Sequence, residues 1–154
     1  MVRQYLEDIK VHEKRRSSAY LLTSDDVAEY ERRWGPHLFH RVSGQAERGG
    51  QIISNAQVVS ISSHLMNSLK PEPAIEAGIG FDEMRFRAPA RVGDTLAFEC
   101  QVVSKRESKS DPRVGIVRAA CRLFNQRNED VLTYVGIAVV TRRTGGTVSS
   151  EKVS

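Results

Sequence analysis

His40 is the side chain in this sequence best suited to acid–base chemistry, because it closes the segment Pro36-His37-Leu38-Phe39-His40 ahead of a long apolar run. A histidine just before a buried helix is well placed to act as a general base, since its ordinary pKa lies near neutral pH. No carboxylate is found in the few residues where a partner acid would be expected. His40 is equally suited to a plain hydrogen bond with a loop, because His37 and His64 show that histidine is not rare here.

The helix that must position such a base is predicted within the run Gln51 to Leu69, which contains no Lys, Arg, Asp or Glu. A solvent-exposed helix would carry charged residues, so we expect this one to be buried on most sides. Ser54-Asn55 is expected to cap its N-terminus, and Lys70-Pro71 to end it. The sequence therefore predicts one long buried helix from Ser54 to Leu69.

A second helix and an edge strand are predicted before this segment. Thr23 followed by Asp26 is typical of a helix start, and Gly35-Pro36 of a helix end. Trp34 in that helix is interpreted as an anchor in the core. The stretch Ser17 to Leu22 is expected to form an edge strand.

After Pro73 the hydrophobic period changes from helical to two, which indicates strands. The strand signals cover residues 95–102, 117–123 and 131–141. The last of these is apolar at nearly every position, as expected for a central strand or one that meets a partner subunit. Together the segments predict an α+β fold in which an antiparallel sheet, formed by the residues after Ile79, curves around the long helix.

Length, composition and charge limit the possible functions. The chain has 154 residues, of which 27% are charged and 40% hydrophobic, as expected for one globular domain over residues 1–143 with a polar, disordered tail at 144–154. The net charge of +4 suits an anionic metabolite, while scattered cations and few aromatic residues disfavour nucleic acid. Cys100 and Cys121 are predicted to be buried thiols. Met1 to Lys10 is polar and no apolar run is long enough to span a membrane, so the cytoplasm is expected.

The chain resembles the MaoC-like dehydratase family, which includes the (R)-specific enoyl-coenzyme A hydratases and has the hot-dog fold. The resemblance extends from about Tyr5 to Arg143. It rests on the order and spacing of Pro36 with Phe39-His40, Gly49-Gly50, Phe86-Arg87-Ala88-Pro89, Val92-Gly93-Asp94-Thr95-Leu96, Glu107-Ser108-Lys109-Ser110, Gly115-Ile116-Val117 and Asn125-Gln126.

The resemblance implies an acid–base pair of one Asp and one His. His40 stands at the family histidine, but Arg33 or Gly35, depending on the alignment, stands where the Asp is expected. A carboxylate from elsewhere, such as Glu31 or Glu47, would have to approach His40 if the protein is a hydratase.

The resemblance also implies an oxyanion donor and substrate contacts. Asn55 corresponds to the backbone N–H donor, and Ser63 to a serine that contributes further along the helix. Asn55 is also simply a residue at a helix start, and Ser63 a small residue that permits close packing. Substrate contacts are expected from Gly50, Ser54 and Arg87, the last of these either to coenzyme A phosphates or as an ordinary exposed cation.

The expected activity is hydration of a 2-enoyl thioester, with no metal or redox cofactor. One alternative is a catalytically degenerate relative that binds acyl-coenzyme A or supports a partner subunit. A thioesterase is a third reading, although that activity usually requires a carboxylate in the central helix. We expect a homodimer that pairs its sheets edge to edge, or a higher homo-oligomer, with no nucleic-acid or membrane partner.

Overall fold

The computed structural model describes residues 2–35 and 51–143. In chain order the elements are β1 (Arg3–Gln4), a 3-10 helix (Leu6–Asp8), β2 (Lys14–Arg16), β3 (Tyr20–Leu21), α1 (Ser24–Trp34), α2 (Asn55–Asn67), β4 (Glu72–Pro73), β5 (Ile75–Phe86), β6 (Thr95–Glu107), β7 (Val114–Phe124) and β8 (Asp130–Thr141). The predicted tail at residues 144–154 lies outside the described residues.

One antiparallel sheet dominates the structure, with strand order β2-β6-β7-β8-β5 and β3 added along β6. A separate parallel pair joins β1 to β4. The position of β8 between β7 and β5 confirms the prediction of a central strand. Because β8 has a hydrogen-bonded neighbour on each side, its backbone N–H and C=O groups are paired within the sheet.

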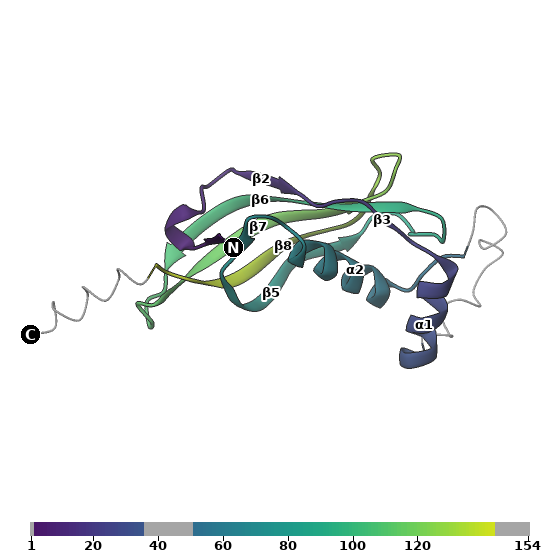
Figure 1. Cartoon of the computed structure of the whole chain (residues 1–154), viewed down its shortest axis with the longest axis horizontal. Helices are drawn as coiled ribbons and strands as arrows, with labels where there is room; N and C mark the ends of the chain where they lie inside the picture. The colour runs from purple at the N-terminus through teal and green to yellow at the C-terminus, as the bar shows by residue number, and fades with distance from the viewer. Residues whose placement is uncertain (1, 36–50, 144–154) are drawn as a thin grey trace, which may run out of the picture.

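Helix α2 lies along one face of the curved sheet, and α1 lies at one end of it (Figure 1). The sheet-facing side of α2 is buried against the strands through Val58, Ile61 and Leu65. This is the α+β hot-dog architecture that the sequence predicts. Burial of α2 is less complete than expected, because an uncharged stripe remains exposed in the described chain: Asn55, Ala56, Ser60, His64 and Asn67.

The ends of both helices follow from local sequence. The Thr23 hydroxyl accepts a hydrogen bond from the Asp26 N–H at 3.2 Å, and Gly35 closes α1 in the left-handed conformation with φ 57°. The Ser54 hydroxyl accepts from the Gln57 N–H at 3.2 Å at the start of α2. Both predicted N-terminal caps are therefore confirmed. The prediction for Trp34 is wrong, since this side chain is 72% exposed at the end of α1.

The N-terminal segment and β5 differ from what the sequence suggests. Leu6 and Ile9 interrupt the polar start of the chain and are buried against Val102, Val117 and Val140. The edge strand predicted at residues 17–22 is a strand only at β3, and β2 precedes it. Between the two, Ser17 donates its N–H to the Phe98 carbonyl, and its hydroxyl accepts from the Phe98 N–H. Strand β5 begins before Ile79 and is mostly exposed, so it lacks a period-two pattern.

Candidate functional site

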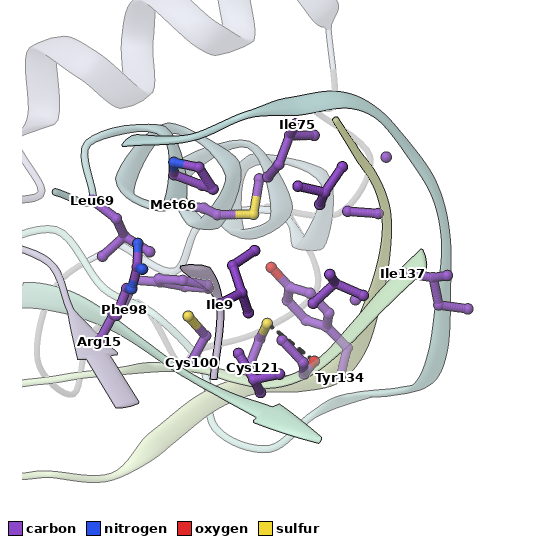
Figure 2. Close-up of a pocket in the computed structure, with 18 of the residues that line it drawn as sticks. Ile9, Arg15, Met66, Leu69, Ile75, Phe98, Cys100, Cys121, Tyr134 and Ile137 are labelled. Carbon is purple, nitrogen blue, oxygen red and sulfur yellow. Dashed lines mark hydrogen bonds between the residues drawn. The ribbon is translucent and has the colours of Figure 1, made fainter. Parts of the chain in front are cut away.

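An apolar cavity of about 280 Å³ lies between the C-terminal half of α2 and the sheet. Ser63, Met66 and Leu69 face it from the helix side. Figure 2 shows Met66, Cys100, Cys121 and Tyr134 converging on this space from the helix and the strands. The size is close to the lower end of small-molecule sites, which is about 300 Å³. An apolar group that binds in this cavity is removed from water, which favours binding.

Ser62 and Tyr134 form a buried hydrogen bond beside the cavity, with 2.9 Å between the two hydroxyl oxygens. Burial raises the pKa of the Tyr134 phenol well above its usual range, so the group is a neutral hydroxyl at physiological pH. The Phe81 ring packs edge-on against Tyr134 at 5.0 Å. Sequence reasoning selected Ser63 and missed this pair, because Tyr134 lies in β8, 72 residues after Ser62.

Cys100 and Cys121 face each other across β6 and β7, and both line the cavity. Both are free thiols. Burial raises the pKa of Cys100 to about 11 and that of Cys121 to about 12. Because the thiolate is the nucleophile, these protonated groups serve as cavity wall and not as attacking groups at neutral pH. Cys121 is buried as predicted, whereas Cys100 is only partly buried.

The N-terminal end of α2 is the one place in the described chain where predicted site residues come together. Ser54 caps the helix, and Asn55 is its first residue with an exposed side chain. The first N–H groups of a helix have no partner within the helix and carry its positive partial charge. They are suited to stabilise an oxyanion. Ser63 lies eight residues further along α2, about 12 Å away at 1.5 Å per residue.

Glu29 and Glu31 of α1 are engaged by neighbouring side chains. Glu29 accepts hydrogen bonds from Arg32 and Arg33, and these bonds hold its pKa below the usual value. Arg33 is thus an exposed helix residue in an ion pair, at the position where the family Asp is expected. Glu31 accepts from the Gln51 side chain at 3.2 Å, which turns it toward the segment before α2.

Arg87, the remaining predicted residue that the structure describes, does not line the cavity. Arg87 donates from Nε to the Thr133 hydroxyl at 3.1 Å and lines a separate, open groove that also includes Lys14, Arg85 and Arg122. His40, Glu47 and Gly50 lie outside the described residues, so their predicted roles stay predictions.

Two further properties concern cofactors and membranes. Within residues 2–35 and 51–143, no cluster of three or more His, Cys, Asp or Glu side chains is arranged to hold a metal ion. No helix in the same part of the chain is long and apolar enough to cross a membrane.

Comparisons with known proteins identify the fold. No protein-family model matches the sequence, and no curated protein matches it either. Among solved structures, the MaoC-like dehydratase from Rhodospirillum rubrum is 28% identical, with a TM-score of 0.77 over 91% of this chain and 98% of that one. The monoamine oxidase regulatory protein from Archaeoglobus is 25% identical, with a TM-score of 0.77 over 92% and 96% of the two chains.

A third structure extends the likeness to a hydratase. The (R)-hydratase PhaJ1 from Pseudomonas aeruginosa has a TM-score of 0.69 at 18% identity, over 90% of this chain and 86% of that one. At that identity the likeness concerns the fold alone. The resemblance seen in the sequence is thus confirmed in three dimensions: the chain has the hot-dog fold of the MaoC-like dehydratases and (R)-hydratases.

Proposed function

We propose that the protein binds an acyl-coenzyme A thioester and reversibly adds water across the double bond of a 2-enoyl group. The observation that carries this proposal is the apolar cavity beneath α2, with Ser63 in its wall, in a chain that shares its fold with MaoC-like dehydratases. An acyl group fills such a cavity by burying apolar surface. The reaction needs no metal or redox cofactor.

The chemistry divides into three tasks. A base takes a proton from water as the water oxygen bonds to the β-carbon, and the electron pair of the double bond moves toward the thioester oxygen. An acid then returns a proton to the α-carbon. In this proposal His40 serves the acid–base steps, and Ser63, in the wall of the cavity, contacts the acyl chain.

The third task is stabilisation of the enolate oxygen, which we assign to the backbone N–H of Asn55. A helix N-terminus favours negative charge, and preorganised N–H donors are effective in a site from which water is excluded. Gly50, Ser54 and Arg87 remain the proposed substrate contacts.

A matched pair of substitutions at Asn55 tests the oxyanion assignment. Asn55→Ala keeps the backbone N–H, whereas Asn55→Pro removes it, and proline is well tolerated at the first position of a helix. We expect the alanine variant to retain most of the hydration rate and the proline variant to lose about 10²–10³ in kcat. Equal rates, with equal thermal stability, would place the donor elsewhere.

The acid–base assignment is tested by the loss of enoyl-thioester absorbance with crotonyl-coenzyme A. We expect a weak rate, because absence of one acid–base group costs about 10²–10⁴. His40→Ala should abolish it, whereas His64→Ala, on the exposed stripe of α2, should not. Arg33→Asp should raise the rate if the missing carboxylate causes the weakness. A rapid rate that is insensitive to His40→Ala would contradict the assignment.

A second candidate is a non-catalytic acyl-coenzyme A binder. It is favoured by the α1 carboxylates, since Glu29 is held by two arginines and Glu31 by Gln51. In that case the wild type and Arg33→Asp would both bind a saturated acyl-coenzyme A without hydrating crotonyl-coenzyme A.

The proposed assembly is a homodimer joined through β5. This strand forms one edge of the sheet in the described chain and exposes Ile79, Phe81 and Phe86. Apolar side chains on an edge strand favour pairing with a second chain. Phe81→Arg should therefore yield a monomer in light-scattering measurements, whereas the charge-matched control Glu76→Gln on the same strand, which also raises the net charge by one, should not.

A further inference from the structure

We propose that Ile9 limits the length of the acyl group that the cavity accepts, because it closes the cavity at the end where the N-terminal segment, residues 3–16, covers the sheet. This inference rests on the proposed binding of an acyl thioester in the cavity. It goes further by naming the residue that selects among acyl groups, and by assigning a preference for chains that end before Ile9.

The cavity exists because α2 is much shorter than the strands beneath it. Helix α2 and strand β6 both have 13 residues. A helix of that length spans about 20 Å, whereas a strand of that length spans about 43 Å. The helix therefore covers only part of the inner face of the sheet. The N-terminal segment covers another part, where it pairs with β4 and β6.

The core is accordingly divided into two hydrophobic clusters, and the cavity lies between them. The larger cluster includes Leu69 of α2 and Phe98 of β6. The smaller one joins Leu6 and Ile9 of the N-terminal segment to three valines of the sheet, Val102, Val117 and Val140. Side chains of both clusters line the cavity. A ligand in the cavity thus lies in the gap between α2 and the N-terminal segment.

The cavity has a closed end and an open side. At the closed end, Ile9 is 4% exposed and Val140 is 1% exposed. On the edge strand β5, Phe81 lines the same cavity and is 54% exposed. Figure 2 shows Ile9 in the space between Met66 of α2 and Cys121 of β7. An acyl chain whose polar head group stays in water enters beside β5, so its terminal methyl group points toward Ile9.

The N-terminal segment is held in place at this end. Lys105 Nζ donates to the Leu6 carbonyl at 3.0 Å, and Arg142 forms an ion pair with Glu7 at 3.1 Å. Both bonds hold the 3-10 helix that Ile9 directly follows. The Ile9 side chain is therefore a fixed end wall, and a longer chain cannot pass it without displacing packed side chains.

These features predict how affinity depends on chain length. Each methylene group that moves from water into the cavity should improve affinity about fourfold. The gain should end once the chain reaches Ile9, because further methylene groups stay in water or disturb the packing. We call the chain length at which affinity stops rising the length limit.

Calorimetry with linear saturated acyl-coenzyme A probes, from butanoyl to dodecanoyl, measures this limit without requiring turnover. Ile9→Ala removes three carbon atoms from the end wall and should move the length limit by about two to three methylene groups. A probe one methylene group beyond the wild-type limit should then bind about fourfold more tightly to the variant than to the wild type. Ile9→Val, a milder change, should move the limit by about one methylene group.

Leu6→Ala is the matched control. Leu6 belongs to the same segment and the same cluster and is also 4% exposed, but it is not one of the described residues that line the cavity. We expect this variant to keep the wild-type length limit. Thermal melting without ligand shows whether the two alanine variants are folded and similarly destabilised.

The outcomes separate this inference from the proposed function. A length limit that stays unchanged in Ile9→Ala and Ile9→Val overturns the role of Ile9 and leaves acyl-thioester binding in place. Equal shifts in Ile9→Ala and Leu6→Ala also overturn it, since a general loosening of the segment then explains both. A wild-type affinity that rises up to dodecanoyl overturns the length limit itself. Absence of binding for every probe overturns both the proposed function and this inference.

Discussion

The two ends of α2 have different surroundings. Its C-terminal half covers the cavity and packs on the sheet through Leu65. The first residues of the chain, which include Gln4 and Ile9, line the same cavity. From Gln57 to His64, another side of α2 meets α1 across an open groove of about 420 Å³, where Ser60, His64 and Trp34 are exposed. The difference suggests a division of tasks: the enclosed end supplies stability and a binding volume, whereas the open end presents the groups suited to chemistry.

The largest expected effect comes from truncation of the α2 core. Leu65→Ala removes a side chain that is 3% exposed, and we expect the free energy of unfolding to fall by about 2–5 kcal/mol. Ser60→Ala, on the exposed side of the same helix, should change it by less than about 0.5 kcal/mol. Urea denaturation at fixed protein concentration gives both values. Similar losses for the two variants would mean that the open side of α2 is covered in solution.

Gly115 in β7 tests how tightly the N-terminal segment closes the enclosed end. A Cβ at this position would meet Leu6 Cδ2 and would lie 2.6 Å from the Arg106 carbonyl oxygen. The backbone oxygen leaves little room to adjust, so Gly115→Ala should reduce the free energy of unfolding by about 1–3 kcal/mol.

Gly78 in β5 is the matched position, since a Cβ there meets no atom of the described chain within 4 Å. Gly78→Ala should be neutral or slightly stabilising. If thermal melting shows both variants to be equally stable, Leu6 and the Arg106 carbonyl do not approach Gly115 as closely as described.

The two helix caps give a smaller and finer comparison. Ser54 is buried and its hydroxyl accepts a hydrogen bond from the buried Gln57 N–H, whereas the Thr23 cap of α1 is at the surface. Loss of a cap costs about 0.5–2 kcal/mol, and a buried unpaired N–H adds to that loss. Ser54→Ala should therefore lower the unfolding free energy more than Thr23→Ala in the same denaturation experiment. The reverse order would show that the start of α2 is as open as that of α1.

Much of the fold was accessible from the sequence because local signals and global packing agree. The uncharged run before Leu69, the caps at Thr23 and Ser54 and the period-two strands all lie where predicted. Strand β5 was not delineated, because a strand exposed on both faces carries no alternating pattern. The site was accessible only in part. Ser63 was selected, but the part of the cavity wall that comes from the N-terminal segment was missed, since Gln4, Glu13 and Arg15 reach it through pairing with β4 and β6 that no local pattern reveals.

The smallest expected effect, which is absent at neutral pH, concerns Cys100 and Cys121, the two thiols that line the cavity from the sheet. Burial raises the pKa of Cys100 to about 11 and that of Cys121 to about 12, from an ordinary value near 9.0. Above pH 9 the unfolded chain therefore releases thiol protons that the folded chain still holds. Because the folded state then binds more protons, the free energy of unfolding falls as pH rises from about 9 toward 12. Denaturation of the Cys100→Ala/Cys121→Ala variant should show a shallower decline over this interval than the wild type, with no difference in slope between pH 6 and 8. Equal slopes of the two proteins above pH 9 would mean that water reaches both thiols. The sheet side of the cavity would then be open to solvent, like the groove between α1 and α2.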